Sequence, residues 1–258
     1  MNRRKNQRLS SQEKELEKRI RPKTPAALRS KWRRWLPRLK GDVTDLYRKL
    51  QIYKELVSIV KADKKTLDPP AFFNWARDNY IVAICIGIRR LSDKDLDSIS
   101  LRRLLGEVAL RPDVVSRDSF RALHWQKDCT SRDADVSFDK IVGRGKSHVS
   151  AQMVTADVKK LAQADERIRR FVNKRLAHHV PLGQIRRFPT LSEVEEALEV
   201  FDELFAKYNM LISGDGFITL YATPQYDWRR VLAHAWMSNT PGRRPKRYQG
   251  PKHVYISF

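Results

Sequence analysis

The chain has 258 residues, 41% of them hydrophobic, and its 52 lysines and arginines exceed its 30 acidic residues, which gives a formal net charge of +22. The 6 tryptophans, 8 tyrosines and 10 phenylalanines exclude a fully disordered chain, and the length predicts one large domain or two small ones. The longest apolar run, residues 80–88, is shorter than the roughly 18 residues that a membrane-spanning helix needs. We therefore expect no membrane span.

The cysteines and histidines do not follow a disulfide or metal-binding pattern. Cys85 lies in the apolar run and Cys129 in a polar stretch, and the sequence contains neither Cys-x-x-Cys nor His-Glu-x-x-His. The N-terminal segment is basic but lacks the apolar core of a secretory signal. These features predict a cytoplasmic protein that needs no metal and no cofactor.

The positive charge is concentrated at the two ends of the chain. Residues 1–40 carry 15 basic and 3 acidic side chains, residues 240–258 carry 5 basic and no acidic ones, and residues 41–239 are only mildly basic. We therefore expect a basic N-terminal extension, a helical domain and a basic C-terminal tail with these boundaries. Such ends attract polyanions such as RNA or DNA through counterion release. The candidate nucleic-acid contacts are Arg33, Arg34, Arg38, Lys40, Arg243, Arg244, Lys246 and Arg247.

Two tryptophans, Trp32 and Trp35, stand among the basic residues of the N-terminal extension. Such a mixture can lie on a membrane interface or stack on bases. We favour a simpler interpretation, in which a basic arm docks its two tryptophans on the body of the protein. Pro22, Pro25 and Pro37 predict that this segment is interrupted rather than one long helix.

The first three main helices are predicted from hydrophobic spacing. Apolar residues three and four apart indicate a helix over about 42–62, which the sequence Asp68–Pro70 ends. A second helix runs from the prolines to Leu91, and because it is apolar on most faces we expect it at the centre of the bundle. A third begins at Ser98–Ser100 and ends near Arg111.

Residues 116–150 are rich in aspartate, serine and glycine, which predicts a long polar insertion with one short helix at about 120–125. The run Gly143–Ser147 resembles a phosphate-binding loop. Lys140 stands where the Walker pattern requires a glycine, so we reject that assignment.

Two more helices complete the expected fold. The fourth runs over about 155–177, and the fifth begins with a capping box formed by Thr190 and Glu193 and ends at Gly214. The sequence thus predicts an all-α, helical bundle of four to five main helices with basic, partly irregular extensions.

The densest polar cluster lies at the end of the fourth predicted helix. Arg170, Lys174 and His178 are successive residues four apart, Asn173 lies beside that row, and Arg175 lies near it. One interpretation is a solvated basic helix end whose histidines interact with the helix dipole. The other is a phosphate-handling site, in which histidine serves as acid or base and the cations stabilise developing charge.

A second charged cluster, Arg89, Arg90 and Asp93, ends the second predicted helix. We favour ion pairing with the next helix. The alternative is that these residues orient the neighbouring helix of the bundle or line the cleft of the phosphate-handling site. The aromatic residues Tyr80, Trp75 and Trp228 are interpreted as core or dimer contacts rather than as platforms for base stacking.

Several segments of the chain resemble the HEPN superfamily, specifically its AbiU-type abortive-infection branch. The likeness covers about residues 42–236 and leaves both basic ends outside. It rests on Asn173–His178, Pro189–Thr190, Lys207–Tyr208, Asn79–Tyr80, Ile88–Asp93, Ser98–Leu105 and Gln225–Trp228.

This resemblance implies a helical, commonly dimeric domain of toxin–antitoxin, abortive-infection and RNA-processing systems. Active members are metal-independent endoribonucleases with an Arg-x4–6-His motif, and two copies of the motif meet across the dimer. His178 matches the histidine of the motif and Asn173 its polar companion, but Val172 occupies the arginine position. Either Arg170, Lys174 or Arg175 supplies the cation, or the site binds RNA without cutting it.

The sequence therefore predicts an RNA-targeting protein of a bacterial or phage-linked defence or toxin–antitoxin system, with endoribonuclease activity, a homodimeric state and a possible cognate antitoxin or defence partner. The alternative is a non-catalytic nucleic-acid-binding or regulatory partner protein with a degenerate HEPN site.

Overall fold

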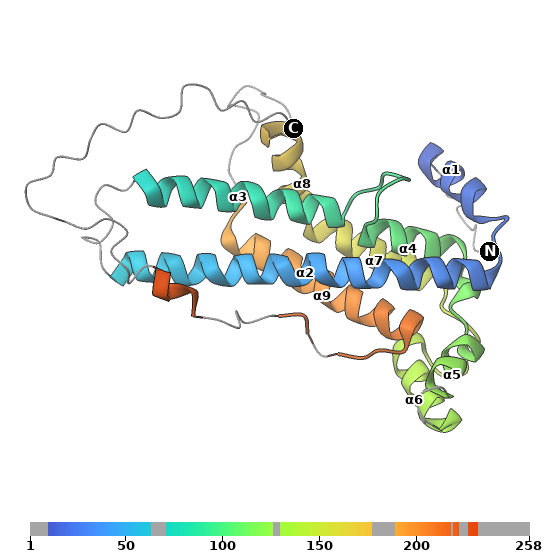
Figure 1. Ribbon diagram of the computed structural model, residues 1–258. Helices are drawn as coiled ribbons and strands as arrows, with labels where there is room; N and C mark the ends of the chain where they lie inside the picture. The colour runs from blue at the N-terminus through green and yellow to red at the C-terminus, as the bar shows by residue number, and fades with distance from the viewer. Residues whose placement is uncertain are drawn as a thin grey trace, which may run out of the picture. The chain divides into compact units, whose positions relative to one another are not determined.

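The computed structural model describes residues 10–62, 71–125, 130–176, 189–217, 219–221 and 227–231. Over these residues the fold is all-α, as expected, and the single β-type pairing is an isolated bridge between Ser116 and His148 (Figure 1). The chain divides into two compact units, residues 1–223 and 224–258. In the second unit the structure describes one 3-10 turn, η4 (Trp228–Val231).

The first unit contains the helices that form the bundle. In chain order they are α1 (Ser11–Ile20), α2 (Pro25–Ala62), α3 (Ala71–Leu91), α4 (Leu101–Leu110), η1 (Pro112–Val114), α5 (Arg117–Trp125), α6 (Ser131–Val142), α7 (Ala151–Ala164), α8 (Glu166–Phe171), η2 (Val172–Leu176) and α9 (Leu191–Ser213). Figure 1 shows α2 running beside α3 and α9, and α4 lies against α7. None of the helices within the described ranges is long and apolar enough to cross a membrane.

Helix α2 begins at Pro25, so the predicted start at residue 42 is wrong. Proline is acceptable in the first turn, but Pro37 inside the helix removes one backbone hydrogen bond, at a cost of about 3 kcal/mol. Burial offsets this cost, because Trp32 is fully buried and Trp35 is 8% exposed. The two tryptophans do dock on the body, as expected, but they do so from a continuous helix rather than from an arm.

Helix α3 has the predicted bounds but does not lie at the centre of the bundle. Ile84 and Ile88 are buried, whereas Trp75 is 62% exposed and Ile86 47%. The central position belongs to α2, which packs on both α3 and α9. The apolar composition of α3 therefore divides between a core face and an exposed face.

The polar insertion is more ordered than its composition indicates. The short helix expected at 120–125 is confirmed as α5, and α6 is an additional helix that begins after the N-cap Thr130. Arg117 links the two, because its guanidinium pairs with Asp135 at 3.1 Å and with Asp139. Polar residues here form ion pairs between two helices instead of an irregular loop.

The predicted fourth helix, over 155–177, is interrupted at Asp165. That residue ends α7 and begins α8, and a π-turn, η2, follows α8 directly. A buried apolar face nevertheless continues across the break, since Leu161, Ile168 and Phe171 are all buried. The fifth helix begins as predicted: the capping box of Thr190 and Glu193 is present, and Gly214 ends α9 with a φ of 72°.

Candidate functional site

The predicted catalytic cluster lies on α8 and η2, only partly within the described residues. Arg170 is in α8, and Asn173 and Lys174 are in η2. Arg175 belongs to η2 by its backbone, and the structure does not describe its side chain. His178 lies outside the described residues. The expected row of Arg170, Lys174 and His178 assumed a regular α-helix, and the π-turn changes that spacing.

Arg170 turns to its own helix rather than to Asn173. Its guanidinium pairs with the carboxylate of Glu166 at 2.7 Å, one turn earlier in α8, and 64% of its side chain is exposed. Val172, at the arginine position of the motif, is 7% exposed and belongs to the hydrophobic core. This position therefore faces the interior in this chain, which explains why it is apolar.

A different arginine contacts Asn173. The Nε of Arg89, near the end of α3, donates a hydrogen bond to Oδ1 of Asn173 at 3.4 Å. The same guanidinium pairs with Asp93 through Nη1 at 3.2 Å. About a third of each of these two charged side chains is exposed, 30% for Arg89 and 31% for Asp93, so the arginine is held in place but accessible to solvent. Tertiary packing thus brings a cation to the residue that the motif leaves without one.

Arg89 is not among the catalytic candidates predicted from the sequence. The signal that could have found it was the cluster of Arg89, Arg90 and Asp93 at the end of a helix. Ion pairing is present for Arg90, but its partner is Asp42 of the preceding helix α2, at 2.9 Å, and not a residue of the next helix as we expected. Arg89 pairs with Asp93, just beyond the end of α3, and also reaches Asn173 of η2.

A buried acid, Asp165, lies at the junction of α7 and α8, near several cations. The side chain is fully buried, and burial raises the pKa of its carboxyl, whereas the charges of Arg169, Arg102 and Arg89 act to lower it. Repulsion by Arg102 lowers the pKa of the Lys94 ammonium, with burial and Arg169 acting in the same direction. Cations are therefore crowded in this region, a condition that favours an approaching anion such as phosphate.

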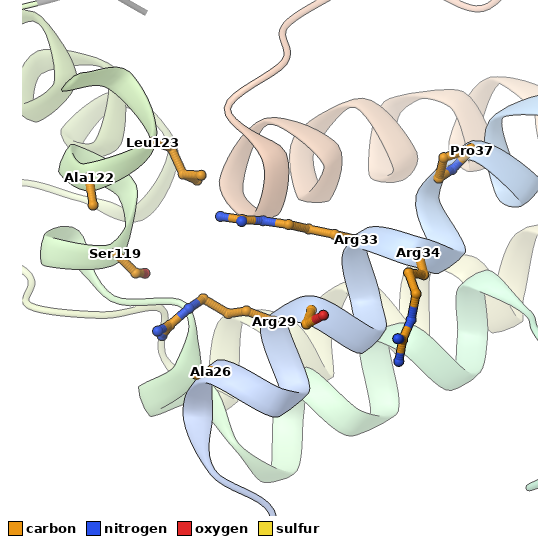
Figure 2. A pocket seen from close by; sticks show the side chains of 9 residues that line it. Ala26, Arg29, Arg33, Arg34, Pro37, Ser119, Ala122 and Leu123 are labelled. Carbon is orange, nitrogen blue, oxygen red and sulfur yellow. The ribbon is translucent and has the colours of Figure 1, made fainter. Parts of the chain in front are cut away.

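The candidate nucleic-acid contacts of the N-terminal segment divide into two groups. Arg33 and Arg34 line a groove of about 640 Å³ between α2 and α5 (Figure 2). Arg38 pairs with Asp42 at 3.4 Å, and Lys40 lies over the ring of Phe217 at 5.6 Å from its centroid. The four C-terminal candidates, Arg243, Arg244, Lys246 and Arg247, lie outside the described residues.

Within the described part of the chain, no group of three or more histidine, cysteine, aspartate or glutamate side chains has a geometry that could hold a metal ion. The described site is built from guanidinium, amide and carboxylate groups.

Comparison with known proteins gives a family assignment. No curated protein and no solved structure matches the chain. The family model for HEPN AbiU2, described as AbiU2, matches residues 29–231, which is more than half of the chain and includes α2 from its second turn together with the whole Arg89–Asn173 region. The chain therefore belongs to the AbiU2 family of HEPN proteins.

Proposed function

We propose that this protein is an RNA-targeting endoribonuclease of a bacterial defence or toxin–antitoxin system, active in the cytoplasm and independent of metal ions. The observation that carries the proposal is the hydrogen bond from Arg89 to Asn173. In the HEPN motif an arginine precedes the polar residue, and here Val172 is buried at that position. Arg89 would supply the missing positive charge from α3.

The chemistry of RNA cleavage suits these residue types. The 2′-oxygen attacks the adjacent phosphorus, the bond from phosphorus to the 5′-oxygen breaks, and the products carry a 2′,3′-cyclic phosphate and a 5′-hydroxyl. A base takes the proton of the 2′-hydroxyl, and an acid gives a proton to the departing 5′-oxygen. His178 would serve as acid or base because imidazole titrates near neutral pH. Arg89 would stabilise the negative charge that develops on the phosphoryl oxygens.

Of the cations whose side chains the structure describes, Arg89 is the one that donates a hydrogen bond to Asn173. Arg170 is paired with Glu166, and its guanidinium would have to leave that partner to act. Lys174 is half-buried in η2 and remains a secondary candidate, as does Arg175. Asn173 is exposed, so a phosphate could approach both its amide and the guanidinium of Arg89.

The proposal includes a homodimer, in which two copies of the site form one cleft. The exposed apolar face of α3 supports this part. Trp75, Val82 and Ile86 follow one another at intervals of seven and four residues, which places them on one side of the helix, and each is more than a third exposed. Arg89 is on the same helix, so a partner seated on this face would lie close to the candidate site.

The test uses purified full-length protein, total RNA and EDTA. We expect products that end in cyclic phosphates, and we expect both His178→Ala and Arg89→Gln to abolish them. Arg90→Gln is the matched control, because it removes the same group from the neighbouring residue, which pairs with Asp42 rather than with Asn173. Equal loss in Arg89→Gln and Arg90→Gln would overturn the role of Arg89, and unchanged cleavage in His178→Ala would overturn the nuclease proposal.

A second candidate function is a non-catalytic nucleic-acid-binding or regulatory partner protein. Val172 favours this second function, because it occupies the position at which the HEPN motif has its arginine. In the same experiment this function predicts RNA that is retained by the protein and not cut. A cognate antitoxin or defence partner that co-purifies with the chain would point to the regulatory form of this alternative.

A further inference from the structure

Arginines line a groove between α2 and α5, and its described walls contain no acidic side chain. We call it the arginine groove, and its volume is about 640 Å³. The lining includes Arg29, Arg33 and Arg34 from α2, and Ser119, Ala122 and Leu123 from α5.

Two of the arginines reach across the groove. Figure 2 shows Arg29 and Arg33 extending from α2 toward α5, whereas Arg34 points in another direction. Each of the two is oriented by a backbone carbonyl: Arg29 donates from Nη1 to the oxygen of Val114 at 3.4 Å, and Arg33 donates from Nε to the oxygen of Ile212 at 3.0 Å. A guanidinium has five N–H donors, so most of them remain for a ligand.

The charge of these two side chains is not neutralised by the described residues. A carbonyl oxygen orients a guanidinium but carries no full charge, and no acidic side chain described by the structure forms an ion pair with Arg29 or Arg33. The nearby acid of α5, Asp118, points to Arg121, whose Nη1 lies 3.5 Å from it. The arginine groove therefore favours the binding of an anion, and above all of a polyanion.

Apolar side chains border the groove beside this charge. Ala122 and Leu123 of α5 form the wall opposite the arginines, and Pro37 of α2 lies on the arginine side. Arginine binds phosphate oxygens with paired N–H groups, and it also stacks on planar rings. Arg29 and Arg33 are one helical turn apart, about 6 Å, so they can engage successive phosphates of one strand while bases rest on the apolar wall.

The groove is separate from the proposed catalytic residues. Arg33 and Asp42 are about two and a half helical turns apart, so they project from opposite sides of α2. Asp42 contacts Arg90, the neighbour of Arg89. A strand held in the arginine groove would thus be bound on the far side of α2 from the contact between Arg89 and Asn173.

We propose that the arginine groove binds the phosphodiester backbone of a single nucleic-acid strand through Arg29 and Arg33. The identification of that strand as RNA rests on the proposed function, whereas the binding chemistry does not. The assignment goes beyond the basic extension predicted from the sequence. It adds Arg29, keeps Arg33, and leaves Arg38 and Lys40 with the intramolecular contacts described above.

The experiment measures the affinity of the full-length protein for a fluorescent 15-nucleotide strand. A 2′-O-methyl RNA strand cannot undergo the cleavage reaction, so binding is measured apart from catalysis, and a DNA strand of the same sequence shows whether the sugar matters. We expect the double variant Arg29→Gln, Arg33→Gln to weaken binding by about tenfold or more and to lower the slope of log K against log salt concentration by about 1.4, the value for two lost phosphate contacts.

Two controls separate the groove from net charge and from folding. Lys61→Gln with Lys159→Gln removes the same total charge from exposed positions outside the groove, and we expect little change in affinity. Ala122→Glu leaves both arginines in place but adds a carboxylate to the opposite wall, and we expect it to weaken binding, whereas Ala122→Lys preserves or strengthens it.

Equal weakening in the groove variant and in the lysine control would overturn the proposal, as would equal effects of Ala122→Glu and Ala122→Lys. Cleavage of unmodified RNA is followed in parallel. If the native protein does not cleave RNA but its binding still depends on the groove, the proposed nuclease activity is refuted and the groove assignment stands.

Discussion

The buried carboxylate of Glu107 joins α4 to the N-terminal half of α2, and its removal should destabilise the whole bundle. Its side chain is fully buried. One oxygen, Oε2, accepts a hydrogen bond from Trp32 Nε1 at 2.8 Å, and Oε1 lies 2.6 Å from Lys31 Nζ and 3.3 Å from Arg103 Nε. We expect Glu107→Gln, which keeps the size of the side chain but removes its charge, to leave two cations without a counter-charge.

The magnitude follows from the burial of those cations. The side chains of Lys31 and Arg103 are only 16% and 10% exposed, and burial lowers the pKa of the Lys31 ammonium, an effect that Glu107 opposes. Removing one partner of such a buried pair costs about 3–5 kcal/mol. Domains are stable by about 5–15 kcal/mol, so this loss is a large part of the total.

The assay is equilibrium denaturation by urea, followed by tryptophan fluorescence and circular dichroism. Glu15→Gln is the matched control, because Glu15 lies on an exposed helix surface and pairs with Arg19, and we expect no measurable change there. Adding Lys31→Met to Glu107→Gln should restore part of the lost stability, since it removes one of the unpaired cations. If Glu107→Gln is as stable as the Glu15 control, the reasoning about this buried cluster is refuted.

Three further predictions concern α2 and α3. Burial raises the pKa of the Cys85 thiol to about 12, so the thiol stays protonated at pH 8. Mass spectrometry should therefore detect alkylation of Cys85 only after unfolding, and alkylation of Cys85 in the native protein would contradict this. A Cβ on Gly87 would lie 2.5 Å from Cδ2 of the buried Leu46, so Gly87→Ala should destabilise the protein by about 1 kcal/mol or more. A Cβ on Gly41 would have nothing within 4 Å, so Gly41→Ala should stabilise the protein by about 1 kcal/mol. Thermal melts that show a change of the same sign for both variants would refute the packing argument. Trp75→Asp should convert the proposed dimer to a monomer in analytical ultracentrifugation without loss of helicity, and an unchanged assembly mass would exclude this face as the interface.

The elements that the sequence predicted correctly are those with a local cause. The capping box at Thr190 and Glu193 is formed by residues three apart, and the terminating glycine at 214 needs only its own backbone freedom. The N-cap Ser100 likewise accepts a hydrogen bond from the amide of Arg103, as its position before an apolar run indicates. Such signals depend on neighbours along the chain and can be recognised without a fold.

The errors have a common origin in long-range packing. Pro37 is a local signal against helix, yet α2 continues through it because Trp32 and its neighbours are buried against residues of α4 that lie far away in the sequence. The apolar stripe of α7 continues into α8, so periodicity did not reveal the break at Asp165. In α3, periodicity could not distinguish a buried apolar face from an exposed one.

The candidate site shows the same division. The all-α class, the family resemblance, the excess of positive charge and the motif with Asn173 and His178 could all be recognised without a fold. Composition, helical period and short spacings are properties of residues close together along the chain. Three features required the folded protein: the burial of Val172, the hydrogen bond of Arg89 to Asn173 from 84 positions away, and the position of Arg29 and Arg33 opposite α5 with no acid among the described lining residues. The physical reason is that a hydrogen bond or a charged groove depends on distance in space, and the packing of α2, α3 and α5 sets that distance.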